Sequence, residues 1–109
     1  LLYLSGCGPI DPKTGEVCRG TVEEQTRVVL NNLKIVCEAA GTGFENAVKV
    51  LAFLKDFNDF DAYNKAYGEF FKYDGNAPAR STIEANLWGG ILVEIEMVVF
   101  VPDSACCCK

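Results

Sequence analysis

Apolar residues recur along the chain with helical spacing in two segments. Between residues 22 and 40 the apolar spacing is three, four or seven, which is typical of an amphipathic helix. Thr21 followed by Glu24 forms a capping-box sequence at its start, and Gly41 is a typical helix stop. The predicted buried stripe contains Val22, Val29, Leu33, Val36 and Ala40.

A second helix is predicted to begin at Asp56 or Asn58, either of which can cap it, and to extend to about residue 71. An aromatic stripe at helical spacing supplies its packing face, namely Phe60, Tyr63, Tyr67, Phe70 and Phe71. The simplest interpretation of this stripe is hydrophobic core.

Five other segments predict strands. Residues 1–5 and a short run around Val17 are expected to pair antiparallel across the wide glycine- and proline-containing turn between them. The apolar run at 47–54 predicts a buried strand, and 80–85 and 91–101 predict two more, joined by "NLWGG". The order β-β-α-β-α-β-β packs two helices on one mixed sheet, which is an α+β sandwich of two layers.

The last predicted strand, "ILVEIEMVVFV", carries apolar residues on both of its faces. One face is wholly apolar: Ile91, Val93, Ile95, Met97, Val99 and Val101. The other face holds Leu92, Glu94, Glu96, Val98 and Phe100. That second face is too apolar for open water, while buried carboxylates need partners. We therefore expect it to meet another subunit, with Glu94 and Glu96 lining a polar gap or forming salt bridges between subunits.

The composition indicates one globular domain, predicted over residues 1–101, with a cysteine-rich tail at 102–109. The net charge is -5 and the basic residues are dispersed, so neither nucleic acid nor an anionic membrane surface is expected as a partner. No apolar run has the length of a bilayer span. Histidine is absent, which excludes histidine general bases and histidine-ligated zinc.

The six cysteines do not have the spacing of a disulfide or metal framework. Cys7, Cys18 and Cys37 are scattered, whereas Cys106, Cys107 and Cys108 are adjacent, and no C-x-x-C pair occurs. We interpret them as reduced thiols of an intracellular protein. The pattern does not indicate a role for the three tail cysteines.

Arg80 stands in "GNAPARSTIEA", where a loop of small residues leads into a predicted strand. One interpretation is an ordinary surface arginine at a strand edge. The other is a fixed cation for an anionic ligand, because guanidinium stays charged and its planar fork matches a carboxylate. The residue pattern alone leaves both interpretations open.

Six segments of the chain resemble one known family, the Rid (reactive intermediate deaminase) proteins, also called YjgF-like, endoribonuclease L-PSP or translation-inhibitor proteins. They are "LYLSG", "PIDPKTGEV", "EQTRVVLNNLKIVCEAAGTGFENAVKV", "FLKDFNDFDAYNKAYGEFF", "APARSTIEA" and "LVEIEMVVFV". The combination of "PARST" with "VEIE" is the most specific part, and the similarity covers almost all of residues 1–101 in order.

The resemblance implies a chorismate-mutase-like fold and a homotrimer with an inner β-barrel and clefts between subunits. It implies hydrolysis of reactive enamine and imine acids, such as 2-aminoacrylate and 2-iminopropanoate, to 2-keto acids and ammonia, that is, a 2-iminobutanoate/2-iminopropanoate deaminase. Neither cofactor nor metal is implied, and the expected ligands are imines, enamines or keto acids.

Four residues acquire roles from the resemblance. Arg80 matches the arginine that holds the substrate carboxylate, and Glu94 matches the acid that positions water. Asn64, in "DAYNKAY", and Gly6, in "LSGCG", match positions that bind substrate or shape the cleft.

The chain departs from the family pattern in three places. Cys7 stands where glutamine is frequent, Gly8 precedes Pro9 where a larger apolar residue is common, and "LWGG" replaces a loop usually written Leu-Pro-Lys. A "GPYSQA"-like segment, whose tyrosine contributes to the family's site, is also not present in the given sequence. Either it lies upstream of Leu1, which the start of the sequence inside a predicted strand favours, or the site of this chain is incomplete.

Two further functions stay open beside the deaminase. One is a non-catalytic member that binds small carboxylates or partner proteins through the same clefts. The other, a ribonuclease, is disfavoured because an acidic chain without histidine lacks the usual means of phosphodiester cleavage. We expect a cytoplasmic location; an organellar copy would need a targeting segment outside this chain.

Overall fold

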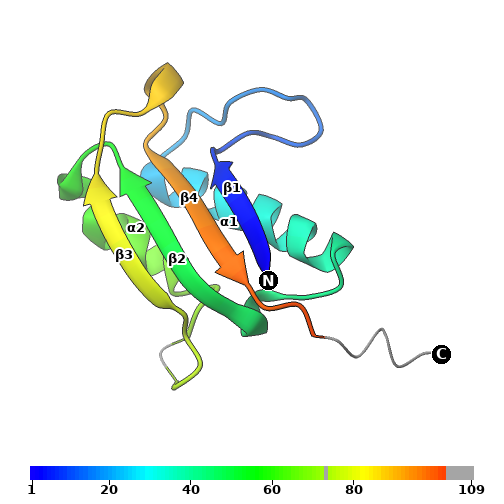
Figure 1. Cartoon of the computed structure of the whole chain (residues 1–109). Helices are drawn as coiled ribbons and strands as arrows, with labels where there is room; N and C mark the ends of the chain where they lie inside the picture. The colour runs from blue at the N-terminus through cyan, green and yellow to red at the C-terminus, as the bar shows by residue number, and fades with distance from the viewer. Residues whose placement is uncertain (73, 103–109) are drawn as a thin grey trace.

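The computed structural model describes residues 1–72 and 74–102, so the tail cysteines lie outside the described part. Its strands are β1 (Leu2–Cys7), β2 (Ala47–Leu54), β3 (Ala79–Glu84) and β4 (Val93–Val99), and its helices are α1 (Val22–Ala39) and α2 (Phe60–Tyr67). Three 3-10 turns lie at Phe44–Asn46, Phe57–Asp59 and Trp88–Gly90. Both helices cover the same face of the sheet (Figure 1), which confirms the predicted α+β sandwich of two layers.

The sheet has the strand order β1-β4-β2-β3. Strand β4 is antiparallel to both β1 and β2, whereas β2 and β3 are parallel, so the sheet is mixed as predicted. Strand β3 occupies one edge and β1 the other.

The predicted strand around Val17 is wrong. Val17 makes a single isolated bridge to Ile10, and the partner of β1 is β4. Residues 11–16 form a turn with its own backbone hydrogen bonds, since Asp11 N–H donates to Glu16 O (2.8 Å) and Gly15 N–H donates to Asp11 O (2.8 Å). This compact turn leaves few backbone groups that could pair with another strand.

Helix α1 begins as predicted. The Thr21 hydroxyl accepts from Glu24 N–H (3.2 Å), and Thr21 N–H donates to the Glu24 carboxylate (2.8 Å), which completes the capping box. Just beyond the C-terminus of α1, Gly41 has a φ of +83°, a conformation that favours glycine.

The buried stripe of α1 differs from the predicted one at its C-terminal end. Val36 is 47% exposed and Ala40 is exposed. The buried residues are instead Val22, Gln25, Thr26, Val29, Leu30, Leu33 and Cys37. Because α1 packs against α2 as well as β4, its buried face turns toward the α2 side of the helix. On that side Arg27 forms a bidentate ion pair with Glu69 beyond the end of α2 (2.8 and 3.0 Å).

Helix α2 is shorter than predicted. Asp56 caps the 3-10 turn through Asn58 N–H (2.8 Å), and the α-helix ends at Tyr67. The predicted aromatic packing face is confirmed, with ring centroids 5.8 Å apart for Tyr63–Tyr67 and 4.8 Å apart for Tyr67–Phe71. All three of these aromatic side chains are buried.

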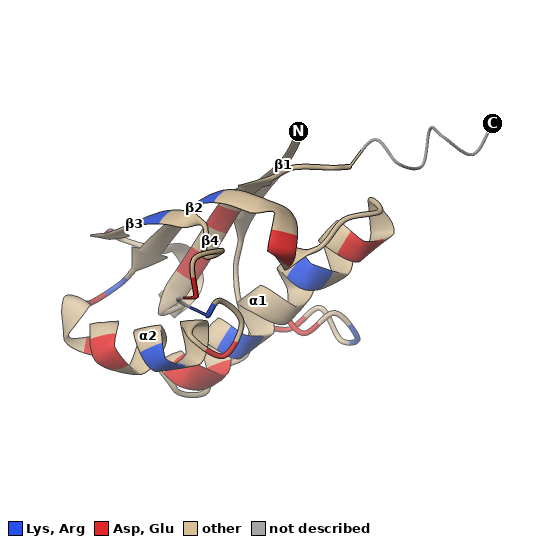
Figure 2. Cartoon of the chain, turned by 90° about the horizontal axis from the view of Figure 1, so that it is seen from below, with Lys and Arg blue, Asp and Glu red and all other residues tan. Residues whose placement is uncertain are grey.

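Strand β4 shows the predicted alternation: Val93, Ile95, Met97 and Val99 are buried, whereas Glu94, Glu96 and Val98 are half-buried. The face of the sheet opposite the helices, here called the outer face, is not covered by either helix (Figure 1). Seen from below in Figure 2, both helices lie on one side of the sheet, and acidic residues, in red, lie along β4. In the described part of the chain, neither helix meets the length and hydropathy that crossing a membrane requires.

Candidate functional site

Arg80 lies on the edge strand β3 and points to the helix side of the sheet. Its register partner on the neighbouring parallel strand is Val50, which is fully buried in the core. The Arg80 guanidinium therefore reaches α2, where Nη1–H donates to Asn64 Oδ1 (2.7 Å). A longer hydrogen bond of 3.4 Å runs from the same Nη1 to the Tyr63 hydroxyl.

Three aromatic rings surround the same guanidinium. Its Cζ atom lies 4.4 Å from the ring centroid of Tyr67, 5.6 Å from that of Tyr63 and 5.7 Å from that of Phe60. These distances are within the range of cation–π attraction. The sequence pattern predicts these rings as core only. Counted from Phe60, however, Tyr63, Asn64 and Tyr67 are at i+3, i+4 and i+7, a spacing that places the rings and the amide on one side of α2.

Glu94 and Gly6 lie side by side on the outer face. Val93 faces the core, so the next residue of β4, Glu94, projects to the opposite face. A register shift between Leu4 and Cys7 of β1 creates a bulge that contains Gly6. A β-carbon built on Gly6 would collide with the Glu94 carboxylate. The predicted cleft-shaping glycine thus makes room for the predicted acid.

Cys7 follows this bulge and is half-buried. Burial raises the pKa of the Cys7 thiol, and the nearby Glu94 carboxylate raises it further, while a hydrogen bond with Asn32 lowers it. At neutral pH the thiol is therefore protonated, and it is a poor nucleophile.

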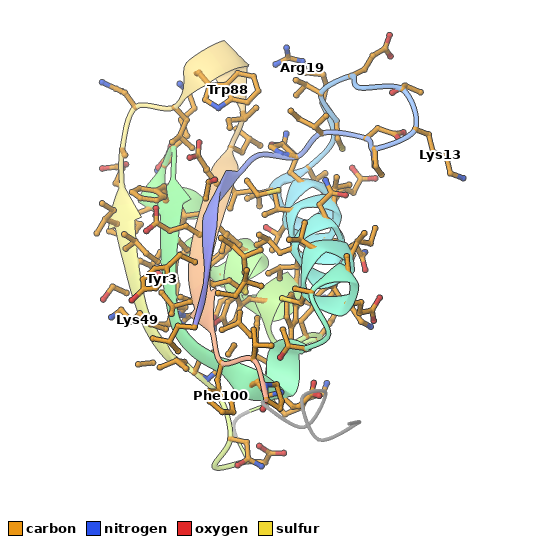
Figure 3. The ribbon with its side chains drawn as sticks, turned by 45° about the vertical axis from the view of Figure 1, so that its right-hand side comes forward. Tyr3, Lys13, Arg19, Lys49, Trp88 and Phe100 are labelled. Atoms are coloured by element: carbon orange, nitrogen blue, oxygen red, sulfur yellow. The ribbon has the colours of Figure 1, made fainter. Side chains whose placement is uncertain are left out.

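The "LWGG" loop forms the 3-10 turn at one end of the sheet. The Trp88 ring lies against Gly8, where an added β-carbon would be 3.1 Å from Trp88 Cζ2. Arg19 Nη1–H donates to the carbonyl of Gly89, and Figure 3 shows Arg19 and Trp88 at the same end of the molecule. The tryptophan therefore occupies space that a side chain larger than glycine at position 8 would need. Trp88 is 51% exposed.

The four predicted site residues form two pairs in one chain. Arg80 and Asn64 are bonded on the helix side, and Glu94 and Gly6 are adjacent on the outer face. Strand β2 separates β3 from β4, so the strands that carry Arg80 and Glu94 are two strand spacings apart, roughly 10 Å. The register also sets Arg80 level with Met97, three residues along β4 from Glu94, and the two side chains face opposite ways. One chain does not bring Arg80 and Glu94 together around a small molecule.

Two surface hollows lie elsewhere. One of ≈ 500 Å³ lies between the 11–18 segment and α1, and one of ≈ 610 Å³ lies between the end of α1 and the segment after α2. Neither of these hollows is lined by Arg80, Asn64 or Glu94. Within residues 1–72 and 74–102, no group of three or more Cys, Asp or Glu side chains is arranged to hold a metal ion.

Comparison with known proteins gives consistent matches. Residues 1–101 match the family described as endoribonuclease L-PSP. A RutC family protein of Pyrococcus horikoshii is 43% identical over 100 residues, which are 91% of this chain and 78% of that protein. Of solved structures, YyfA of Yersinia pestis, described as a member of the conserved Rid protein family, has a TM-score of 0.85 at 42% identity, covering 91% of this chain and 79% of YyfA. TdcF of E. coli, solved with bound serine, has a TM-score of 0.84 at 32% identity, covering 92% of this chain and 80% of TdcF.

Proposed function

This chain belongs to the endoribonuclease L-PSP family, which includes the Rid and YjgF proteins, and we propose from this premise that it hydrolyses small 2-imino acids to 2-keto acids and ammonia. The observation that carries the proposal is the Arg80 guanidinium, held by Asn64 at a sheet edge with part of its hydrogen-bonding capacity unused by the described residues. The serine bound by TdcF also has an α-carboxylate, the group that Arg80 would hold here.

The reaction needs little from the protein beyond positioning. Water adds to the electrophilic C=N carbon, the C–N bond then breaks, and the nitrogen leaves as ammonia while the carbon becomes a keto group. Arg80 holds the carboxylate, and Glu94 orients the water, accepts its protons and passes them to the nitrogen that leaves as ammonia. The reaction is redox-neutral, so the proposed mechanism uses no cofactor.

The proposed site is formed between two copies of the chain. Since Arg80 and Glu94 face opposite sides of one sheet, they act on one small substrate only if Glu94 comes from the outer face of a neighbouring copy. The outer face is suited to such packing because it combines apolar side chains with these carboxylates: Tyr3 is 73% exposed and Ile83 is 44% exposed, while Leu51, Phe53 and Val98 are half-buried. We propose that three copies join through their outer faces in a homotrimer.

A coupled assay tests the proposed reaction. A dehydratase generates 2-aminoacrylate from serine, and keto-acid release is followed with and without this protein. We expect faster release with the wild type and loss of the acceleration in Arg80→Ala. The matched control is Arg27→Ala, which removes an arginine paired with Glu69 on the helix surface. No acceleration by the wild type, with trimer present and pyruvate bound, would favour a non-catalytic carboxylate-binding protein instead.

A further inference from the structure

We infer that Asn64 is a positioning residue that fixes the Arg80 guanidinium on an aromatic bed, so that its Nε–Nη2 edge is offered for side-on binding of one planar carboxylate. The aromatic bed consists of the rings of Phe60, Tyr63 and Tyr67. This inference deepens the proposed function and takes from it only the identity of the ligand as a 2-keto or 2-imino acid. Asn64 then acts through Arg80 rather than by contacting the substrate.

The hydrogen bonds of Arg80 are all made at one end of the guanidinium. Nη1 donates to Asn64 at 2.7 Å and to the Tyr63 hydroxyl at 3.4 Å, which accounts for both of its hydrogens. In the described part of the chain, Nε and Nη2 have no hydrogen-bond acceptor. An end-on fork would need a free Nη1 hydrogen. Only the side-on edge, Nε–H with Nη2–H, is left for two carboxylate oxygens.

The aromatic bed keeps the guanidinium in this orientation. The rings of Tyr63 and Tyr67 are 0% and 1% exposed, so they belong to the packed core and do not move aside. Tyr63 is also within 3.4 Å of the Thr82 hydroxyl on β3, which links the ring to the strand that carries Arg80. One face of the guanidinium lies against Tyr67 and one end is hydrogen-bonded to Asn64. Rotation about the last side-chain bonds of Arg80 is therefore restricted.

The arrangement requires arginine rather than lysine at position 80. A lysine at position 80 would keep the positive charge but has no planar fork and could not bond Asn64 and a ligand in the same directions. The aromatic faces carry negative electrostatic potential, so a second anionic group of a ligand near the bed is disfavoured. We therefore expect small monocarboxylates to be preferred over dicarboxylates of similar size.

Binding of pyruvate, a stable keto acid, tests the inference without any turnover. The protein is labelled with ¹⁵N-arginine, and the Arg80 Nε–H resonance is assigned by its absence in Arg80→Lys. We expect pyruvate to shift this resonance in the wild-type trimer. Asn64→Leu is expected to weaken pyruvate binding about 10-fold and to reduce the ligand-induced shift, since Nη1 is released and the guanidinium turns. The control Asn58→Leu changes an exposed asparagine in the turn before α2 and should bind as the wild type does.

Several outcomes would overturn the inference. One is an Asn64→Leu protein that binds pyruvate with the affinity of the wild type. Another is an Arg80 Nε–H resonance that does not shift when pyruvate binds. The third is a wild-type protein that does not bind pyruvate. Sedimentation of each variant establishes that the oligomer is intact before the titration. Pyruvate binding with the expected Asn64 dependence, combined with no acceleration in the coupled assay, would support the inference and refute the proposed deaminase.

Discussion

Arg80 and Glu94 lie on opposite faces of the same sheet, with strand β2 between their strands. The register places Arg80 beside the buried Val50, and the alternation of β4 places Glu94 away from the buried Val93. Both residues are predicted to act on one substrate. If both act on one substrate, as proposed, one of them must come from a second copy of the chain.

Mixed oligomers should recover activity that each parent variant lacks. The Arg80→Ala and Glu94→Gln chains carry different affinity tags and are co-expressed. Purification through both tags then yields trimers that contain both kinds of chain. If each site takes Arg80 from one copy and Glu94 from the next, one site in every mixed trimer is intact, so we expect about a third of the wild-type activity. Trimers of either variant alone should have almost none.

The mixed trimers distinguish a site shared between two copies from a site within one copy. If Arg80 and Glu94 of the same chain worked together, no site in a mixed trimer would be intact, and the doubly tagged material would be as inactive as its parents. Wild-type chains carrying the two tags, purified in the same way, provide the reference activity.

A charge on the outer face should prevent assembly. Leu51 is half-buried on β2 and lies opposite Glu96 of β4, so Leu51→Asp places two carboxylates across from each other in the proposed interface. We expect a folded monomer by sedimentation velocity and loss of activity. Ile35→Asp, at a 55% exposed position of α1, is the matched control and should remain trimeric. A trimeric Leu51→Asp protein would contradict the proposed use of the outer face.

The fold could be predicted largely because its signals are local. The period-two alternation of "VEIEMVV" identified the buried face of β4, and the Thr21–Glu24 pair identified the start of α1. Strand pairing was less predictable, because alternation shows which face is buried but not which strand lies alongside. For this reason the sequence pattern predicts a pairing of the segment around Val17 with residues 1–5 that the structure does not contain.

The candidate site was predictable only in part. The resemblance to the family assigns roles to Arg80 and Glu94, and these roles stay predictions. Their placement on opposite faces depends on the parallel register of β3 with β2 and the antiparallel register of β4, which span distant parts of the chain. The sequence also does not predict the aromatic bed, because a buried ring has the same sequence pattern whether or not it contacts a cation.

Replacing Gly6 should damage the site while the fold is kept. The φ of Gly6 is not in the left-handed region, so alanine fits the backbone, but its β-carbon would displace the Glu94 carboxylate. We expect Gly6→Ala to lower the rate about 10- to 100-fold in the coupled assay, because a misplacement of about 1 Å is costly in catalysis. Circular dichroism should show an unchanged fold. Gly68→Ala, whose new β-carbon would make only ordinary contacts of 3.4 and 3.5 Å, should keep wild-type activity.

The reactivity of Cys7 with iodoacetamide should report the charge of Glu94. Burial and the Glu94 carboxylate both raise the pKa of this thiol, and only the thiolate reacts. Glu94→Gln removes the second of these causes, so the pKa falls, while burial keeps it above its ordinary value. The alkylation rate therefore rises at any pH where the wild-type thiol is only partly ionised. Residue-resolved mass spectrometry measures the Cys7 rate separately from the other cysteines. The control Glu96→Gln removes an equal charge that is not among the causes of the shift, and it should leave the pH profile in place. If both variants gave the wild-type profile, Glu94 would not be next to the β1 bulge as the structure has it.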